Sequence, residues 1–399
     1  MHRPGAGQLA SPDPGDEIGG SPEQVRVPFV LMRGGTSKAV FLREDDLPAD
    51  RGAWDPIILA LFGSPDPRQV DGLGGADILT SKLAIIGPAS RGDADLDYTF
   101  AQVSIDEPVV DYDINCGNIS AAVGAFAVDE GFVTAEGPAA HVRIHNTNTG
   151  RVLVAEVPVR QGRSVVEGDL AIAGVPGTGS PILLDYADTA GGATGALLPT
   201  GRAADELRTP TGTVTASVVD IGNLCVFFAS ADVGMRGTEG PAELTPDHLR
   251  RILDVKTATA ELLDLPRAGL VPIPVAIGAP ASYPCFGSGR VVSADEVDLV
   301  ARVVGGRPPV MHKAFPGTAG VTTAVAARIP DSVVFETARR REDGEPVSIG
   351  HPSGVVPVWV EARLEAGGWV VARAAYARTA RRLAEGTSFV RRSLWPNPP

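Results

Sequence analysis

Cysteine is scarce in this chain of 399 residues. Only three are present, Cys116, Cys225 and Cys285, and no two of them form a CxxC pair. An odd and widely spaced set argues against a disulfide framework and against a zinc site built from cysteine. The six histidines contain no HExxH motif, so a histidine-based metal site has no support either. We therefore expect neither a metal nor a bound cofactor.

Long apolar runs and clustered positive charge are also missing. No run approaches the ~20 apolar residues that cross a bilayer. The first 24 residues lack the apolar core of a signal peptide and are predicted to be a disordered lead-in. The net charge of −13 argues against a nucleic-acid partner, because phosphate binding needs clustered Lys and Arg. We expect a cytoplasmic protein with no membrane partner, and consider a homodimer as its assembly.

Aromatic residues make up only 5% of the chain, whereas it has 47 Gly and 34 Pro. This composition favours many short strands and turns over a helical bundle, and the length favours two domains. Runs rich in Val, Ile and aromatic residues predict the following strands: 25–32, 81–87, 96–105, 141–147 and 151–159 in the first half, and 213–221, 224–230, 356–365 and 369–378 in the second.

Two Ala-rich segments, 118–132 and 317–330, are predicted to be helices. Small residues lie on several of their faces, so a sheet can enclose each helix. Each half thus has strands, a Gly turn and a small-residue helix, which indicates a duplicated architecture. The Gly- and Pro-rich stretch 173–202 is the predicted crossing between the halves. A more polar helix over 245–263, with Thr245 as its N-cap, is expected at the surface.

Cys116 lies in the sequence Asn115-Cys116-Gly117-Asn118, immediately before the first Ala-rich helix. A thiol at a helix N-terminus is close to free N–H donors and to the positive end of the helix dipole, which favours the thiolate. The alternative is a buried cysteine that only packs. We expect Cys225, in the run LCVFF, to lie in the core, and Cys285, in a Gly/Pro turn, to be structural.

Two glycine loops, RGGTSK (33–38) and DGLGGADILTSK (71–82), offer amides, hydroxyls and an ammonium group that suit carboxylate or phosphate oxygens. Neither matches a nucleotide-binding loop. Lys82 begins an apolar strand, where desolvation would lower its pKa and make it a general base; a solvent-facing lysine is the alternative. In the second half, HKAFPGT (312–318) and GHPSG (350–354) offer similar groups, although GHPSG also fits a plain turn.

These motifs occur in an order that resembles one family. MRGGTSK, DGLGGADILTSK, DYTFAQVSIDEPVVDYDINCGNISAAVGAFAVDEG, HKAFPGTAGVTTAVAARIP, GHPSG and RTARRLAEG together resemble the PrpF family, which includes 2-methylaconitate cis–trans isomerase and 4-oxalomesaconate tautomerase. The resemblance implies an α+β, diaminopimelate epimerase-like fold, with two similar domains that each roll a mostly antiparallel sheet around a central helix. It places the active site between an N-terminal domain, 25–200 with 376–399 returning to it, and a C-terminal domain, 201–375.

The resemblance also implies the site. PrpF-type enzymes pair the cysteine with a lysine, so Cys116 and Lys82 are the expected catalytic residues. Racemases of this fold carry a cysteine at each helix start, whereas Pro316-Gly317-Thr318 has none. The groups expected to bind substrate are Arg33, Gly34, Gly35, Thr36, Ser37, Ser81, Asn115, Gly117, Asn118, Lys313, Gly317, Thr318, Ser353 and Gly354.

The implied function is a cofactor-independent isomerase or tautomerase that shifts a proton on a small unsaturated tricarboxylic acid of the 2-methylaconitate, aconitate or 4-oxalomesaconate type. DGLGGADILTSK (71–82) together with TGALLPTG (194–201) resembles the oxalomesaconate branch, and HKAFPGTAGVTTAVAA (312–327) resembles the methylaconitate branch, so the substrate is left open. Two alternatives are a non-catalytic polycarboxylate-binding protein and an amino-acid racemase, the latter disfavoured by the missing second cysteine.

Overall fold

The computed structural model describes residues 21–113, 116–267, 269–306, 308–342 and 344–396. Strands dominate it, and nineteen of them join one hydrogen-bonded network, while β14 and β15 form a separate pair. The strands are β1 (Gln24–Gly34), β2 (Ser37–Arg43), β3 (Lys82–Pro88), β4 (Leu96–Val103), β5 (Val110–Asp111), β6 (Ala139–Asn146), β7 (Arg151–Arg160), β8 (Arg163–Ser164), β9 (Ile182–Asp185), β10 (Asp205–Thr209), β11 (Gly212–Ile221), β12 (Asn223–Ala229), β13 (Ile273–Gly278), β14 (Tyr283–Pro284), β15 (Val291–Val292), β16 (Leu299–Gly305), β17 (Val310–Met311), β18 (Val347–His351), β19 (Gly354–Glu365), β20 (Gly368–Arg378) and β21 (Ala380–Arg391).

Helices are fewer. The α-helices are α1 (Trp54–Phe62), α2 (Gly117–Asp129), α3 (Pro246–Leu262), α4 (Gly317–Ala326) and α5 (Val333–Thr337). Short 3₁₀ turns are η1 (Glu44–Asp46), η2 (Arg51–Ala53), η3 (Ala187–Thr189), η4 (Ser230–Val233), η5 (Pro241–Glu243), η6 (Ala294–Glu296) and η7 (Arg392–Leu394). Within the described parts of the chain, no helix combines the length and the apolarity needed to span a bilayer.

Helix α2 is enclosed by strands of the first half. Its residues from Gly117 to Val128 are all buried, and it packs on strands that include β1, β6, β7 and β9. A Cβ atom at Gly124 would lie 2.8 Å from the Cβ of Ala155 in β7, closer than side chains approach in a packed core. The small residues that predicted an enclosed helix are therefore what allows the sheet to close around it.

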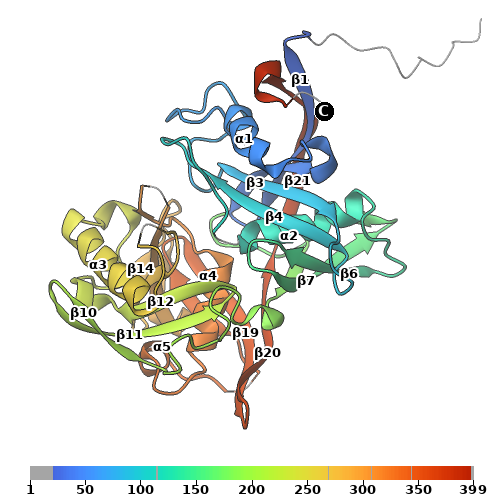
Figure 1. Cartoon of the computed structure of the whole chain (residues 1–399). Helices are drawn as coiled ribbons and strands as arrows, with labels where there is room; N and C mark the ends of the chain where they lie inside the picture. Colours follow the sequence, from blue (N-terminus) through green and yellow to red (C-terminus); the bar gives the residue numbers. More distant parts are fainter. Residues whose placement is uncertain (1–20, 114–115, 268, 307, 343, 397–399) are drawn as a thin grey trace, which may run out of the picture.

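Helix α4 has the same surroundings in the second half. All ten of its residues are buried, and it packs on β11, β12, β19 and β20. Figure 1 shows α2 among the blue and green strands and α4 among the yellow and orange ones. The fold is thus a mixed, sheet-rich one in which two groups of strands each surround one small-residue helix.

The end of the chain returns to the first group of strands. Strand β20 pairs with β19 on one side and with β9 on the other. Strand β21 then runs antiparallel to β1 from Gln24 to Gly34, with one irregularity between Leu31 and Met32. In Figure 1 the red C-terminal strand accordingly lies beside the blue β1.

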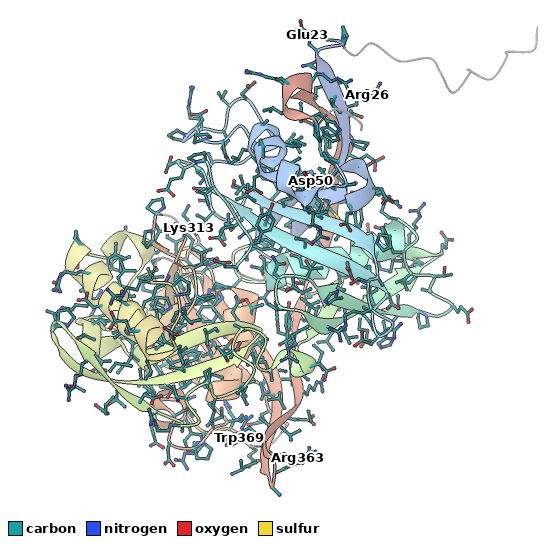
Figure 2. All side chains as sticks on the ribbon, viewed as in Figure 1. Glu23, Arg26, Asp50, Lys313, Arg363 and Trp369 are labelled. Carbon is teal, nitrogen blue, oxygen red and sulfur yellow. The ribbon has the colours of Figure 1, made fainter. Side chains whose placement is uncertain are left out.

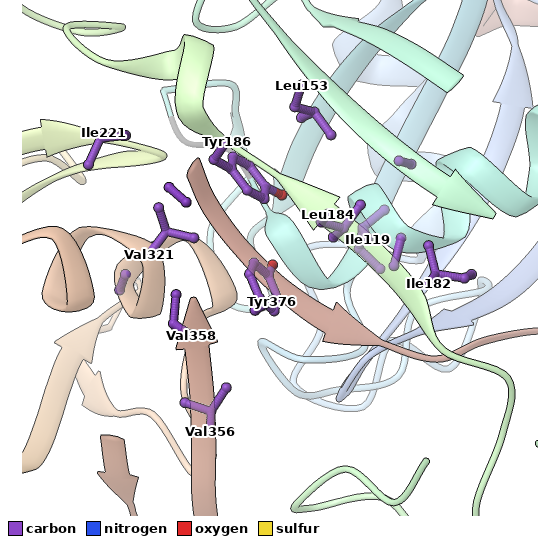
Figure 3. Packing of buried hydrophobic residues seen from close by; sticks show 14 of the residues in the cluster. Ile119, Leu153, Ile182, Leu184, Tyr186, Ile221, Val321, Val356, Val358 and Tyr376 are labelled. Atoms are coloured by element: carbon purple, nitrogen blue, oxygen red, sulfur yellow. The ribbon is translucent and has the colours of Figure 1, made fainter. Parts of the chain in front are cut away.

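The core is continuous from one group to the other. One buried cluster contains Ile119 of α2 and Val321 of α4. Figure 3 shows Tyr186 and Tyr376 between them, and these two rings stack with centroids 5.9 Å apart. Burial of large aromatic side chains here ties both groups of strands to the same apolar interior.

Most elements lie where the sequence predicted them. The Thr245 side chain accepts a hydrogen bond from the His248 amide at 3.1 Å, which confirms it as the N-cap of α3. The stretch 173–202 is more structured than a simple crossing, because it contains β9, which pairs with β7 and β20. Helix α1 was not predicted, since its run WDPIILALF is short, contains a proline at its third position and lacks a polar face after Asp55.

Candidate active site

Cys116 is the N-cap residue of α2. Its backbone is extended, with φ −116° and ψ 97°, and its carbonyl accepts hydrogen bonds from the amide and the hydroxyl of Ser120 at 2.9 and 3.1 Å. The helix therefore begins directly after the thiol, as the Asn/Gly turn predicted. The side chain is partly exposed, so the thiol remains accessible at the end of the helix where unpaired N–H groups lie.

Lys82 is the first residue of β3 and is only 7% exposed. Its Nζ donates to Oε1 of Gln102 at 2.6 Å and lies 5.3 Å from the centre of the Phe100 ring. Burial lowers the pKa of Lys82, and the charges of Cys116 and Asp77 oppose that shift. The expected desolvated lysine is confirmed, and the solvent-facing alternative is wrong.

Cys116 and Lys82 line the same cavity. It has about 740 Å³ of empty space, part of which is open to solvent, and its wall includes the first residues of both enclosed helices, Gly117 and Gly317. The remaining polar groups at its wall are Ser37, Gln102, Asn118, Asn223 and His312. The structure therefore brings together a thiol, an amine and two helix N-termini from three separate elements, β3, α2 and α4.

Both helix starts close around one tyrosine. A Cβ atom at either Gly117 or Gly317 would overlap the hydroxyl of Tyr376, so only glycine fits at these two positions. Figure 3 shows Tyr376 between the helices. Burial raises the pKa of Tyr376 to about 12, which keeps the phenol neutral. The two helix N-termini, each with a partial positive charge, are thereby held next to the same cavity.

The RGGT turn (33–36) packs closely against Asn118, one of the residues that line this cavity. A Cβ atom at Gly34 or Gly35 would overlap Asn118, and Gly35 has φ +50°. Arg33 donates through Nη1 to the carbonyls of Gly35 and Thr379, both at 2.9 Å. The Gly35 amide donates to the Thr379 carbonyl at 2.9 Å. Arg33 and Gly35 therefore build the turn, and the structure does not place them at the cavity wall.

Asn118 and Thr36 support each other at the start of α2. The Asn118 Nδ2 donates to Oγ1 of Thr36 at 3.0 Å, and its Oδ1 accepts from Nε of Arg378 at 3.0 Å. Asn118 lines the cavity, whereas Thr36 lines a neighbouring cavity instead. Ser37 lines the cavity and is buried. Thr318 accepts from Nδ2 of Asn223 at 2.7 Å and so fixes that amide at the start of α4.

Several expected substrate-binding residues lie elsewhere. Ser81 is fully buried; its hydroxyl donates to the carbonyl of Val103 at 2.9 Å and accepts from Gln69 at 2.8 Å, so its only O–H is not available to a carboxylate. Lys313 forms an ion pair with Asp77. Asn115 lies outside the described residues.

The polar groups of the GHPSG turn (350–354) also form hydrogen bonds with other parts of the protein. The Ser353 hydroxyl donates to the carbonyl of Lys313 at 2.5 Å, and the carbonyl of Gly354 accepts from the Tyr283 hydroxyl at 2.6 Å. Neither residue is part of the cavity wall. The plain-turn interpretation of this motif is therefore the one that fits the geometry.

Three polar residues of the cavity wall were not among the predicted site residues: Gln102, Asn223 and His312. Gln102 lies directly opposite Lys82 in the pairing of β3 with β4, a register that periodicity alone does not supply. Burial and the charge of Lys82 lower the pKa of His312 to about 4. Its Nδ1 accepts from the Ala314 amide at 3.2 Å, so the neutral ring carries its proton on Nε2. The sequence had pointed to its neighbour Lys313 instead.

The other two cysteines are structural, as predicted. Cys225 is fully buried in β12, and burial raises its pKa to about 12. Cys285 packs in a small cluster with Tyr283 and Val292. In the described ranges no group of three or more His, Cys, Asp or Glu side chains is arranged to hold a metal ion.

Comparison with solved structures defines the class. The fold is similar to a hydroxyproline epimerase from Agrobacterium vitis, with a TM-score of 0.59 at 11% identity over 93% of this chain and 94% of that one. It is also similar to a methylitaconate-delta-isomerase, with a TM-score of 0.78 at 46% identity over 94% of this chain and 100% of that one. The architecture is therefore that of the racemase- and epimerase-like proteins.

Residues 24–391 match the family model described as PrpF protein, and the chain belongs to the PrpF family. It is 48% identical to a 3-methylitaconate isomerase of Eubacterium barkeri, over 93% of this chain and 99% of the relative. It is 38% identical to a 4-oxalomesaconate tautomerase of Pseudomonas putida, over 94% and 99%. It is 37% identical to a 2-methyl-aconitate isomerase of Shewanella oneidensis, over 93% and 98%. The expected family is confirmed, and the chain is an isomerase.

Proposed function

We propose that this chain moves a proton between two carbons of a small unsaturated polycarboxylic acid, with Cys116 and Lys82 as the catalytic pair. The observation that carries the proposal is that both side chains line one cavity together with the N-termini of α2 and α4. Relatives named for methylitaconate, methylaconitate and oxalomesaconate support the same substrate class. The substrate is a short acid with two or three carboxylates.

The reaction needs one group that removes a proton and stabilisation of the charge that remains. Either the Lys82 amine or the Cys116 thiolate takes a proton from the carbon next to the double bond. The C–H electron pair moves into the conjugated carboxylate or carbonyl, the double bond shifts, and a proton is delivered to the distant carbon. Because such carbon acids are weak, stabilisation of the enolate-like charge contributes more than the strength of the base.

The cavity has groups suited to that charge. Unpaired N–H groups at the starts of α2 and α4 and the second N–H of the Asn118 side-chain amide can donate to carboxylate oxygens. Burial lowers the pKa of Lys82, which increases the fraction of neutral amine that can act as a base. His312, held neutral by burial, is an additional N–H donor that brings no positive charge next to Lys82.

The domain boundaries expected from the resemblance belong to this proposal. We assign residues 25–200 and 376–399 to one domain around α2 and residues 201–375 to a second domain around α4. The pairing of β21 with β1 supports the return of the chain end. The catalytic cavity then lies between the domains, because Lys82 and Cys116 come from the first and His312 and Gly317 from the second. The cytoplasmic location and the homodimer stay predictions.

The proposal is tested by incubating the full chain with methylitaconate, 2-methylaconitate or 4-oxalomesaconate and following each acid by NMR. We expect at least one acid to be converted, and Cys116→Ser to abolish that conversion. Racemization of an amino acid, with none of the three acids converted, would contradict the proposal. Tight binding of an acid without conversion would favour the non-catalytic alternative.

A further inference from the structure

A second cavity lies next to the first and shares none of its wall residues. We call it the Arg378 cavity; it has about 530 Å³ of empty space. Its polar wall is formed by Thr36, His351 and Arg378, and its apolar wall includes Ile172, Phe315 and Trp359. Asn118 joins the two cavities, because it lines the catalytic one and its side chain bonds both Thr36 and Arg378.

Arg378 is a buried cation. Only 6% of the residue is exposed, and its guanidinium lies 4.4 Å from the centre of the Tyr376 ring. Its Nε donates to Asn118 and its Nη1 to the carbonyl of Ala377, both at 3.0 Å. Neither bond uses Nη2. Among the described residues no Asp or Glu forms an ion pair with Arg378, and a buried cation without a carboxylate partner is costly.

Two further donors lie at the same wall. His351 is 3% exposed, and its Nδ1 accepts from the Ser353 amide at 3.3 Å. Burial and the charges of Arg378 and Arg302 hold the pKa of His351 well below its ordinary value, so the neutral ring presents an N–H at Nε2. The Thr36 hydroxyl accepts from Asn118 and keeps its own hydrogen free to donate. The wall thus offers donors but has no acidic residue.

We propose that the Arg378 cavity binds the carboxylate of a short aliphatic acid, as a second molecule beside the substrate. The ligand's carboxylate pairs with the Arg378 guanidinium and accepts from His351 and Thr36, which supplies the missing counter-charge. Its hydrocarbon part packs against Ile172, Phe315 and Trp359. Because Asn118 contacts both cavities, occupancy of one changes the affinity of the other by an equal factor in both directions.

The probe for this site is butyrate, with butyramide as its uncharged counterpart, titrated into the full chain by calorimetry. We expect butyrate to bind and butyramide to bind at least about tenfold more weakly, because a charge-assisted hydrogen bond is lost. Arg378→Gln should weaken butyrate binding by a similar factor. Leu170→Trp, which fills the cavity and leaves its charged groups in place, should do the same. Arg381→Gln is the matched control, since Arg381 is exposed and lines neither cavity.

Two results would overturn the proposal. The first is butyrate binding that stays unchanged in Leu170→Trp, with a native melting curve for that variant. The second is displacement of butyrate by tricarballylate in strict one-to-one competition, which would make the carboxylate an arm of the substrate in one shared site. Binding is measured without turnover, so its failure is distinguishable from a failure of the proposed isomerase activity.

Discussion

Lys82 and Cys116 reach the catalytic cavity for different local reasons. The lysine starts a strand that is buried between β2 and β4, whereas the cysteine is the N-cap residue of α2. Burial lowers the pKa of the amine, and the thiol lies at the end of α2 where unpaired N–H groups are found. The site thus pairs an amine of lowered pKa with a thiol, two groups that can carry a proton to and from carbon.

Lys82→Ala and Cys116→Ser should each lower kcat by about 10²- to 10⁴-fold, the usual contribution of a positioned acid or base. Lys38→Ala is the matched control: it ends the first Thr-Ser-Lys motif as Lys82 ends the second, and it is not part of the cavity wall. Turnover by NMR and folding by circular dichroism check the outcome. A Lys82→Ala protein with wild-type kcat would remove the lysine from the mechanism.

His312 should make the fold sensitive to acid. Its pKa is about 4 in the folded protein and about 6.5 when unfolded, so its contribution is fully present above pH 6.5 and is lost as the pH falls towards 4. The loss for this residue amounts to about 3 kcal/mol. Urea unfolding of the wild type and His312→Asn at pH 7 and pH 4 measures it. Equal pH dependence in both proteins would contradict the assignment.

A site residue could be predicted from the sequence where the features that position it lie close to it along the chain. The thiol was found because its Asn/Gly turn and helix lie within a few residues of it. The strand start alone did not show that Lys82 is buried, since a solvent-facing lysine fitted it as well, and only the family resemblance made Lys82 a catalytic candidate. Gln102 and Asn223 were missed because their position depends on strand register and on the approach of α4, which no local pattern contains.

The two helix starts are tied together by Tyr376, so their glycines have a testable role. Gly117→Ala would push a methyl group into the hydroxyls of Tyr376 and Tyr186. We expect the free energy of unfolding to fall by about 1–3 kcal/mol, the usual cost of overpacking. Adding Tyr376→Phe should recover part of that loss, because it removes one of the overlapping oxygens.

The double-mutant cycle compares the four proteins by urea unfolding. Gly92→Ala is the control, since an added Cβ there meets nothing within 4 Å. Strict additivity of Gly117→Ala and Tyr376→Phe would show that the phenol and the helix start do not interact.

The elements themselves were predicted largely from composition. Two Ala-rich runs indicated enclosed helices, and both are buried on all sides. Helix α1 was missed, and β9 lay hidden in a Gly/Pro-rich stretch because a four-residue strand leaves little periodic signal. Its place is set by pairing with β7 and β20, which come from distant parts of the chain.

At the scale of the whole molecule, one ion pair joins the two groups of strands beside the catalytic cavity. Asp77 comes from the glycine loop before β3 and Lys313 from the segment before α4. Figure 2 shows Lys313 on the side of the second group that is turned towards the first. Their sequence neighbours Ile78 and His312 line the cavity. The ion pair therefore fixes the positions of the cavity residues Ile78 and His312 relative to each other.

Lys313→Gln and Asp77→Asn should each raise KM several-fold with little change in stability, because a half-exposed ion pair contributes only about 0–1 kcal/mol. The effect of either change should shrink at high salt, which screens the pair. Arg290→Gln, which breaks an exposed pair with Glu296 far from the cavity wall, is the control. An effect of Lys313→Gln alone would mean that the lysine binds substrate directly.

The most direct test of the central claim follows solvent deuterium into the acid that the chain converts. In heavy water we expect the wild-type protein to place deuterium at the carbon that receives the proton, and Lys82→Ala and Cys116→Ser to slow that exchange by about 10²-fold or more. Exchange at the wild-type rate in both variants would contradict the claim that this thiol and this amine carry the proton.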